Sequence, residues 1–517
     1  MRQGKIILTQ GEDKPVFTEN RSELEQIITD ALDLGTRYPE IERRILADQQ
    51  NHGKQKKAQR VEHRQWERSR YIPLLDDDLR RFEPTVEHLP PELQETGRRR
   101  MPPEMVYIFV LLRGYLGSIT SQDAADRIKD SSAVQNYLEC RGWKLPAMRT
   151  ILDNINAVSQ DTLNYILDCQ IAAALEEDLD DLSEQILDST SVEADSRWPT
   201  DADVIYRLLE RAARLARNAH RLQLPSFVSK YVDRWLEELK KLVMKINTVG
   251  NKPGSKKKRK RCYRVVLKRC RQIVERLAPY AEQWKEVVQE VDLPAYQKER
   301  IQRYVDRFVD DLHSACRMHD QCDERVFNGK HTRARDKVLS ISDESAAFIA
   351  KGDREPVIGY RVQLARSRGG LVCAVNVPEG NVADSDQLYP MVQQSVERSG
   401  VVPSGVTADD GYAAKAGREN VAALGVTHVR LCGSKGKALT PQEEWDSEQQ
   451  RAERSRRSAV ESLMYVLKQG FDFERLHRRG IGRVRSEILE KVIGYNFRRL
   501  ALLRKRRYRE RQQRAAA

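Results

Sequence analysis

The order of strand-like and helix-like patterns constrains the fold of this chain more than any other feature of its sequence. A short strand is predicted at Gln185–Val192, where two apolar residues precede Asp188 and β-branched residues follow it. Helical patterns flank this segment on both sides. An acid in a short central strand is costly to bury unless a partner such as a metal ion neutralises it. Taken alone, the segment favours the simpler interpretation of an exposed acid at a strand edge.

Strand patterns return after Lys337. Pro356–Leu364 and Gly370–Val377 are rich in apolar, β-branched residues and flank a Gly-Gly turn, which predicts a β-hairpin. The remaining segments are predicted as a helix, a short strand ending in acids, a helix, a strand and a helix, at residues 386–398, 405–412, 413–424, 427–431 and 453–469. This order predicts a mixed α/β fold, in which helices flank a mixed five-stranded sheet.

Composition and periodicity divide the rest of the chain into further regions. Residues 1–100 are polar, mixed in charge and unassigned. Residues 101–182 combine short helices with tight turns, which fits equally a DNA-binding domain of helix-turn-helix type and an all-α packing domain. The sheet is predicted to be built from two segments, residues 183–201 and 337–500. A large helical insertion, residues 202–336, lies between them, and a basic tail, residues 501–517, follows them.

The charge balance favours a polyanionic partner. The chain has 90 Lys and Arg against 77 Asp and Glu, a net charge of +13, which favours nucleic acid over an acidic membrane surface. No apolar run approaches the roughly 18 residues of a membrane span, and no secretory signal is recognisable. The eight cysteines contain no Cys-x-x-Cys pair, which predicts free thiols in a reducing compartment. We therefore expect a cytoplasmic protein without a membrane partner.

The insertion contains the most basic segment. Lys252–Arg271 holds eleven Lys or Arg and no acid. A solvated loop beside a basic helix would explain this segment, but the lack of compensating acids favours contact with phosphates. The candidate DNA-binding residues are the consecutive cations Lys256, Lys257, Lys258, Arg259, Lys260 and Arg261.

A second pattern in the insertion invites a zinc interpretation. His313, Cys316, His319 and Cys322 recur at every third residue. On one helix this spacing drifts by about 60° per step, so the four side chains would spread over half of the circumference. They could not converge on one tetrahedral ion unless the helix broke, and zinc binding is therefore disfavoured.

Three acids in the predicted sheet and its last helix form the candidate active site. A helical crossover can return the strand before Asp409 parallel to the first strand, which would place Asp188 beside Asp409. Two adjacent carboxylates repel each other unless a cation lies between them, so the pair suits Mg²⁺. Glu461 would share one helical stripe, about 60° wide, with Arg457, Lys468 and Arg454. A solvated face of mixed charge would also explain this stripe.

The motifs together resemble bacterial insertion-sequence transposases of the DDE class. Asp188-Ser-Thr with Pro199-Thr-Asp resembles that family's first-acid segment, and Ala408-Asp-Asp-Gly-Tyr its second. Gly380-Asn with Asp384 resembles the segment after the hairpin, and Gly494-Tyr-Asn-Phe-Arg the closing helix. Arg457-x3-Glu461-x6-Lys468 matches three positions of the family's Tyr-x2-Arg-x3-Glu-x6-Lys signature, whose Tyr is Arg454 here. The family pattern favours Asp409 over its rival Asp410.

The resemblance implies an RNase H-like core with Asp188, Asp409 and Glu461 as catalytic metal ligands. It implies Mg²⁺, with Mn²⁺ as a substitute, and DNA partners that comprise the element's terminal inverted repeats and a target. It also implies a homodimer in the complex with the DNA ends, and DNA contacts from Arg457 and Lys468. A metal-dependent nuclease without strand transfer and an inactive DNA-binding relative remain alternatives.

Overall fold

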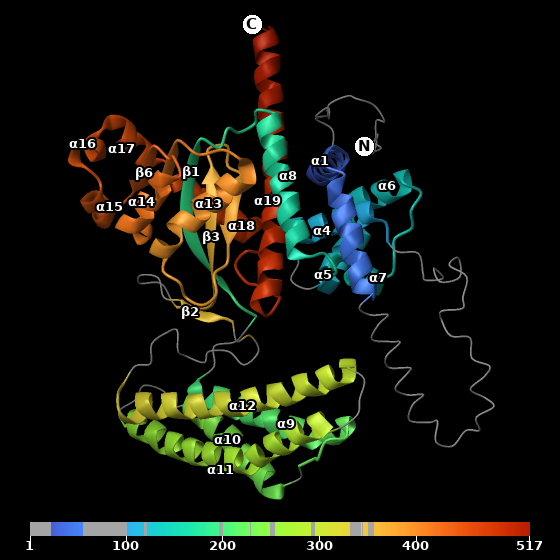
Figure 1. Cartoon of the computed structure of the whole chain (residues 1–517), viewed down its shortest axis with the longest axis vertical. Coiled ribbons are helices and arrows are strands. Elements are labelled where there is room, and N and C mark those ends of the chain that lie inside the picture. Colours follow the sequence, from blue (N-terminus) through green and yellow to red (C-terminus); the bar gives the residue numbers. More distant parts are fainter. Residues whose placement is uncertain are drawn as a thin grey trace, which may run out of the picture. The chain divides into compact units, whose positions relative to one another are not determined.

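The computed structural model describes residues 22–54, 101–117, 121–195, 200–227, 229–248, 254–290, 295–330, 343, 345–349 and 356–516. The chain divides into two compact units (Figure 1). One unit, called the core unit below, comprises Met1–His52, Arg100–Asp195 and Ile349–Ala517. The other, called the bundle unit, comprises Gly53–Arg99 and Ser196–Phe348. Residues 1–21 and 55–100 lie outside the described residues, so the first hundred residues keep no assignment as a whole.

A mixed sheet forms the centre of the core unit. Its strands are β1 (Glu184–Glu193), β2 (Ala347–Ile349), β3 (Val357–Ser367), β4 (Val372–Asn376), β5 (Gly405–Ala408) and β6 (His428–Leu431). The order is β2-β3-β1-β5-β6, and β4 also pairs with β3. The predicted mixed α/β class is confirmed, as are the hairpin and the other predicted strands. The predicted count of five strands is wrong, because a three-residue strand, β2, joins the sheet and is too short to show a period in the sequence.

The register of β1 decides which residues of the sheet lie side by side. β1 runs antiparallel to β3 and parallel to β5. Leu187 lies opposite Ala408 in the parallel pair. The residues that follow them, Asp188 and Asp409, are therefore at matching positions, and the predicted parallel return of the strand before Asp409 is confirmed. Side chains at matching positions of neighbouring strands point to the same face of a sheet.

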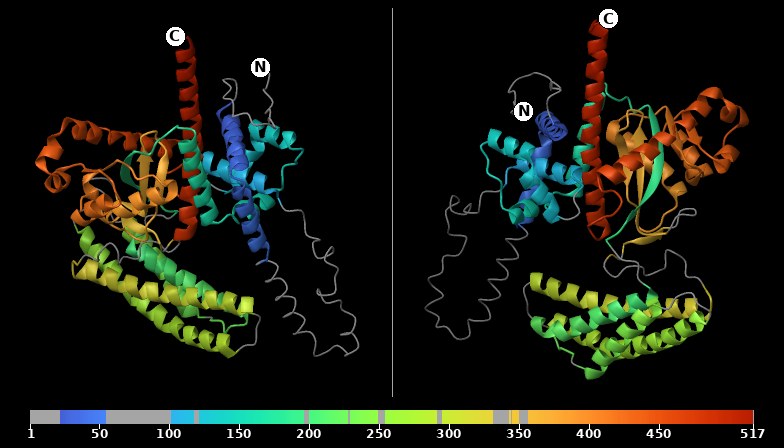
Figure 2. Two further views of the ribbon diagram at one scale, coloured as in Figure 1. Left: turned by 45° about the horizontal axis from the view of Figure 1, so that its top comes forward. Right: turned by 180° about the vertical axis from the view of Figure 1, so that it is seen from behind.

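Helices cover the sheet on both faces (Figures 1 and 2). α13 (Leu388–Ser399) packs against β3 and β4, and α18 (Ser458–Gly470) packs against β1. α14 (Lys415–Ala423) connects β5 with β6. α8 (Gln160–Glu176) and α19 (Ile481–Ala516) pack against each other, and α19 also contacts β4. Gln170 of α8 donates a hydrogen bond of 3.0 Å to the carbonyl of Ile493, so the two helices are joined by polar as well as apolar contacts.

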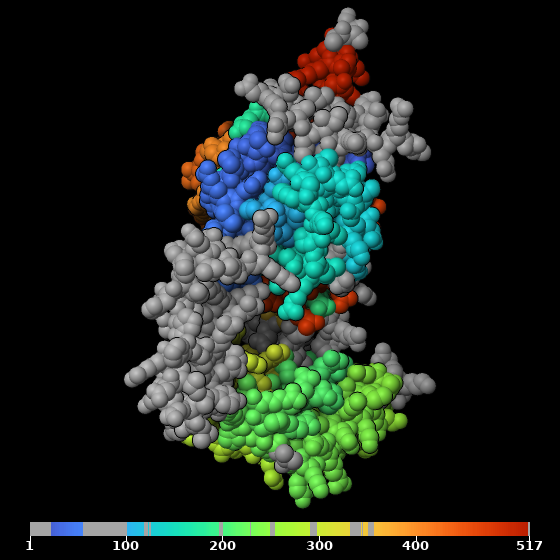
Figure 3. Space-filling model, turned by 90° about the vertical axis from the view of Figure 1, so that its right-hand side faces the viewer, coloured from blue at the N-terminus to red at the C-terminus, as the bar shows by residue number. Residues whose placement is uncertain are grey.

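The N-terminal helices pack around α4 and α19. These helices are α1 (Glu23–Arg37), α4 (Pro103–Tyr115), α5 (Ser121–Asp130), α6 (Ser132–Cys140) and α7 (Met148–Ile155). All residues from 105 to 114 of α4 are buried, as expected of a helix that is apolar on every face and lies at the centre of a helical layer. Figure 3 shows α1 and α5–α7 together on one surface of the core unit. A Cβ atom at Gly114 of α4 would lie 2.0 Å from the carbonyl oxygen of Glu490, so α4 and α19 cross in close contact.

A buried ionic network accompanies this crossing. Arg113 donates hydrogen bonds of 2.9 and 2.7 Å to the carboxylate of Glu490, and Arg478 donates others of 3.0 and 2.6 Å. The side chains of Arg113 and Glu490 are 7% and 4% exposed. Two cations share one acid here, and breaking such a network leaves an uncompensated buried charge.

The bundle unit is built on four helices: α9 (Asp201–Asn218), α10 (Lys230–Thr248), α11 (Ser255–Glu290) and α12 (Ala295–Phe327). Their apolar faces form one core, in which the rings of Trp284 and Phe308 lie 4.5 Å apart. The four helices lie within residues 202–336, the segment for which a helical insertion was predicted. No helix in the described part of the chain is long and apolar enough to cross a membrane.

Candidate active site

Asp188 and Asp409 occupy matching positions on two neighbouring strands. Asp188 lies within β1 and is buried, with 8% of its surface exposed. Asp409 follows β5 with extended backbone (φ −76°, ψ 176°) and so continues the direction of that strand. The sheet therefore brings together two carboxylates separated by more than two hundred residues.

A buried tyrosine connects these two acids to a third. The hydroxyl of Tyr412 donates a hydrogen bond to Gln363. Burial and the nearby carboxylates of Asp384, Asp188 and Asp409 raise the pKa of Tyr412 well above its ordinary value. Three acids from three different segments therefore surround one phenol. A short 3-10 turn at Asp410–Tyr412 orients the ring inward.

Asp384 is a part of this cluster that sequence reasoning did not assign to the site. Its carboxylate accepts hydrogen bonds from Ser189 (3.0 Å), Gln363 (2.8 Å) and Arg361 (3.3 Å). A Cβ atom at Gly411 would lie 3.3 Å from Asp384 Oδ2 and 3.0 Å from Asp409 Oδ1, so the two carboxylates flank this glycine. The motif Gly380-Asn-x2-Asp384 contained the signal, but only the fold shows that Asp384 reaches the residue next to Asp188.

The neighbouring acids Asp409 and Asp410 have different roles. Asp410 accepts hydrogen bonds from the backbone amides of Lys435 (2.9 Å) and Gly436 (3.0 Å), at the first turn of α15 (Ser434–Leu439). Carboxylates at helix N-termini stabilise the helix in this way. Among the described residues, Asp409 accepts a single backbone hydrogen bond, from Gly411 (2.9 Å), so the two bonds that Asp410 accepts favour Asp409 as the candidate metal ligand.

The helix that carries Glu461 differs from its prediction. One helix was expected over residues 453–469, but α17 (Glu448–Ser455) ends before α18 begins at Ser458. The junction is held by hydrogen bonds from an amide to the carbonyl three residues earlier, among them Val460 to Arg457 at 3.0 Å. Ser455 also bonds the carbonyl of Ala452 through its hydroxyl (2.6 Å), a contact that competes with regular helix.

The break removes Arg454 from the predicted stripe. Arg454 lies on α17, where its guanidinium is 4.0 Å from the ring centre of Trp445 in α16 (Gln442–Asp446). The expectation that Arg454 shares a helical face with Glu461 is therefore wrong. Val460, Leu463 and Leu467 are the buried residues of α18.

Arg457 lies near the ends of β5 and β6 and contacts Glu461. Arg457 donates a hydrogen bond of 3.4 Å to Glu461, whose side chain is 65% exposed. Burial raises the pKa of the Cys432 thiol, Arg457 counteracts this effect, and Asp409 adds to it. Arg457 and Asp409 therefore both lie near this thiol, which directly follows β6. Lys468, half-buried on α18, forms no ion pair or hydrogen bond with any described residue.

The donor set at this edge of the sheet suits a hard divalent cation. The carboxylates of Asp188 and Asp409 offer oxygen ligands side by side, which is the chemistry that Mg²⁺ requires. Within the described ranges, no three His, Cys, Asp or Glu side chains are grouped so that they could hold a metal ion together. The convergence of Glu461 with the two Asp residues therefore remains a prediction.

The six candidate DNA-binding residues of the insertion form the first turns of α11. Lys256, Lys257, Lys258, Lys260 and Arg261 are exposed, and Arg259 is partly buried. Six consecutive helical residues point in all directions around the axis, so they cannot all face one DNA segment. For the four residues of the zinc pattern, His313 and Cys316 are exposed whereas Cys322 is buried in the bundle core, so the four do not face one site.

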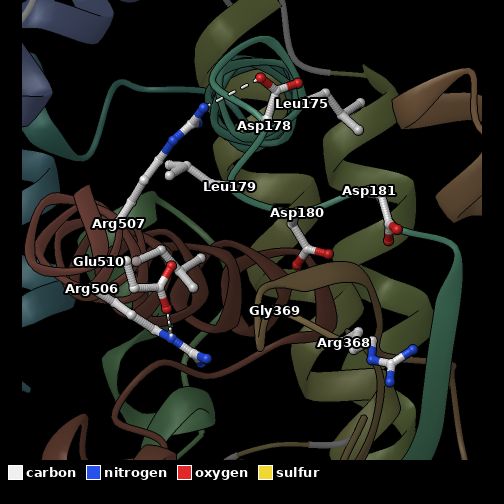
Figure 4. Close-up of a pocket in the computed structure, with 11 residues that line it drawn as sticks. Leu175, Asp178, Leu179, Asp180, Asp181, Arg368, Gly369, Arg506, Arg507 and Glu510 are labelled. Atoms are coloured by element: carbon white, nitrogen blue, oxygen red, sulfur yellow. Dashed lines mark hydrogen bonds and ion pairs between the residues drawn. The ribbon is translucent and has the colours of Figure 1, made fainter. Parts of the chain in front are cut away.

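A hollow in the core unit lies away from the acids just described. It has a volume of about 690 Å³ and lies between the segment before β1, the β3–β4 turn and α19 (Figure 4). Two ion pairs line the hollow: Arg507 pairs with Asp178, and Arg506 pairs with Glu510. Because these charges compensate one another, the hollow is a poor candidate for a metal or DNA site.

Comparison with known families agrees with the motifs. Residues 328–497 match the model of the family described as transposase DDE domain. No match was found among curated proteins or among solved structures. Residues 328–497 are therefore similar to a transposase DDE domain, and the resemblance to DDE-class transposases is confirmed. The matched region includes Asp409, Arg457, Glu461 and Lys468, whereas Asp188 precedes it.

Proposed function

We propose that this protein is a DNA transposase with an RNase H-like core, which binds the terminal inverted repeats of its element, cleaves DNA and joins the freed 3′-OH to a target. The observation that carries the proposal is the parallel register of β1 and β5, which sets Asp188 beside Asp409 at the carboxyl ends of these strands, with Asp409 inside the region that matches the transposase DDE domain. We propose the cytoplasm as its location and a homodimer as its form on the DNA ends.

Asp188, Asp409 and Glu461 are the proposed ligands of Mg²⁺, for which Mn²⁺ can substitute. When bound, two such ions activate water or a 3′-OH and stabilise the leaving oxygen of an in-line displacement. Glu461 lies on α18, which packs against β1, the strand that carries Asp188, and its side chain is 65% exposed and so accessible to an ion. Asp384 acts as a positioning residue, because it fixes the hydroxyl of Ser189 beside Asp188.

Cations around the acids would hold the DNA. Arg457 can bind a phosphate with two parallel hydrogen bonds, and Lys468 supplies a point charge without a partner of its own in the described structure. Among the six cations from Lys256 to Arg261, those on one side of α11 would add affinity through the DNA backbone without reading its sequence. The core would thus supply the chemistry and the basic surfaces the affinity.

The test is an assay with the DNA that flanks the coding region, since transposase ends are expected there as inverted repeats. In Mg²⁺, a transposase should cut at the repeat and join the new 3′-OH to a second DNA molecule. Cutting without a joined product would favour the metal-dependent nuclease. Binding of the ends with neither product would favour an inactive DNA-binding relative.

A further inference from the structure

The surface of α11 concentrates cations on one face. At about 100° per residue, Lys257, Lys260, Arg264, Lys268 and Arg271 lie within about 40° of the direction of Arg264. All five side chains are exposed. Glu275, at the next position of this face, ends the series. We call these five residues the α11 stripe. The other cations of the segment, including Lys258 and Arg259, point elsewhere around the helix.

A groove between α11 and α12 runs along this stripe. Its volume is about 390 Å³, and its walls include Arg264, Lys268 and Arg271 from α11 and His319 and Phe327 from α12. The guanidinium of Arg264 lies 5.7 Å from the ring centre of Phe327, and the ammonium of Lys260 lies 6.0 Å from it. The ring restrains two long side chains, so they lose less conformational entropy on binding a ligand.

Helix stability does not explain the stripe. Cations in the first turn of a helix are unfavourable because the N-terminus carries a partial positive charge, and the first turn of α11 contains no acid. The C-terminal end of α12 beside Phe327 can offset this cost for Lys260 and Arg264. Lys268 and Arg271 lie one to two turns further along. Neither they nor Arg264 forms an ion pair with a residue that the structure describes, although Asp323 also lines the groove.

We propose that the α11 stripe binds the backbone of duplex DNA without sequence specificity, as a DNA surface of the bundle unit that is separate from the acids of the core unit. From Lys257 to Arg271 the stripe spans fifteen residues, or about 21 Å of helix, which matches roughly six steps of 3.4 Å along one DNA strand. Five cations in a row complement such a strand. The inference rests on the proposed function only in that DNA is the partner, since its test requires no cleavage.

The test compares two full-length variants that lose the same charge. One is Arg264→Gln/Lys268→Gln/Arg271→Gln, in the stripe. The matched control is Lys240→Gln/Lys241→Gln/Lys245→Gln, whose three exposed lysines on α10 spread over about 140° of that helix. Affinity for a duplex of arbitrary sequence is measured at a series of salt concentrations, and thermal melting confirms that both variants are folded.

The measured quantity is the slope of the logarithm of the binding constant against the logarithm of the salt concentration. In the stripe variant this slope should be shallower by about 0.9 for each lost phosphate contact, or roughly two to three units in all, and the control should keep the wild-type slope. Equal changes in both variants, or no change in the stripe variant, would overturn the proposal. A stripe variant that binds DNA normally but loses self-association would assign the surface to a second copy of the chain. Lys268→Gln alone should reduce the slope by about one unit.

Discussion

Replacing Arg457 with Ala separates a role in the fold from a role in DNA binding. Arg457 contacts Glu461 at 3.4 Å, and the two side chains are 30% and 65% exposed. An exposed pair four residues apart on a helix is worth only a few tenths of a kcal/mol. Since about 1 kcal/mol shifts the Tm of a domain of this size by roughly 2–4 °C, Arg457→Ala should lower the Tm by about 1 °C or less.

The expected effect on cleavage is larger. A hydrogen bond to a charged group contributes about 1.5–3 kcal/mol, so losing one phosphate contact should slow cleavage of end DNA by roughly ten- to one hundred-fold. Arg457→Lys should recover only part of the activity, because lysine keeps the charge and loses the planar pair of donors. Lys468→Ala should behave like Arg457→Ala, since Lys468 has no partner among the described side chains to stabilise.

The matched control is the preceding residue. Arg456 pairs with Glu453 at 2.6 Å and is 49% exposed, so Arg456→Ala removes the same charge from a neighbouring surface position. It should leave cleavage and Tm nearly unchanged. The reasoning would be refuted if Arg457→Ala lowered the Tm by more than about 5 °C while its folded fraction cleaved DNA normally. Arg457 would then stabilise the fold and would not bind DNA, and other residues would hold the DNA ends.

Two predictions concern the crossing of α4 and α19. Burial raises the pKa of Glu490, but its two arginine partners have the larger effect and lower this pKa below its ordinary value of 4.5. The network should therefore stabilise the fold fully above pH 4.5, and this stabilisation should be lost as the pH falls further. Glu490→Gln should therefore cost about 3–5 kcal/mol in urea unfolding at pH 7 and less in acid, whereas an equal loss at both pH values would contradict the assignment. Gly114→Ala should destabilise strongly in thermal melts because its Cβ would meet backbone at 2.0 Å, whereas Gly482→Ala, with nothing within 4 Å, should be neutral or stabilising. Equal Tm values for the two glycine variants would exclude a rigid crossing.

The sequence predicted the sheet because its strands are periodic and their connections follow general rules. The hairpin turn, the helical crossover and the parallel return of β5 to β1 were sufficient to place Asp188 beside Asp409. Strand β2 escaped prediction because three residues show no period. The break before α18 was also not predicted, because Ser455 and Ser458 are compatible with a helical pattern. In the structure their hydroxyls donate hydrogen bonds to backbone carbonyls, which competes with regular helix.

The candidate site was predicted in part for a similar reason. Sequence motifs identify acids that directly follow or lie within a predicted strand, such as Asp409 and Asp188. The approach of Asp384 to Ser189 depends instead on how the loop after β4 folds back over the sheet. The groove beside the α11 stripe likewise requires the packing of α12 against α11, which the local pattern of either helix does not show. The position of Glu461 relative to the two Asp residues depends on how α18 packs against β1, which local sequence does not determine.

Metal-dependent cleavage by single-acid variants tests the central claim most directly. Asp188→Asn, Asp409→Asn and Glu461→Gln should each abolish cleavage of end DNA in Mg²⁺ while DNA binding remains, because these carboxylates hold metal and not DNA. The exposed Asp386 provides the control, and Asp386→Asn should cleave like the wild-type protein. Normal Mg²⁺-dependent cleavage by Asp188→Asn or Asp409→Asn would contradict the proposed active site.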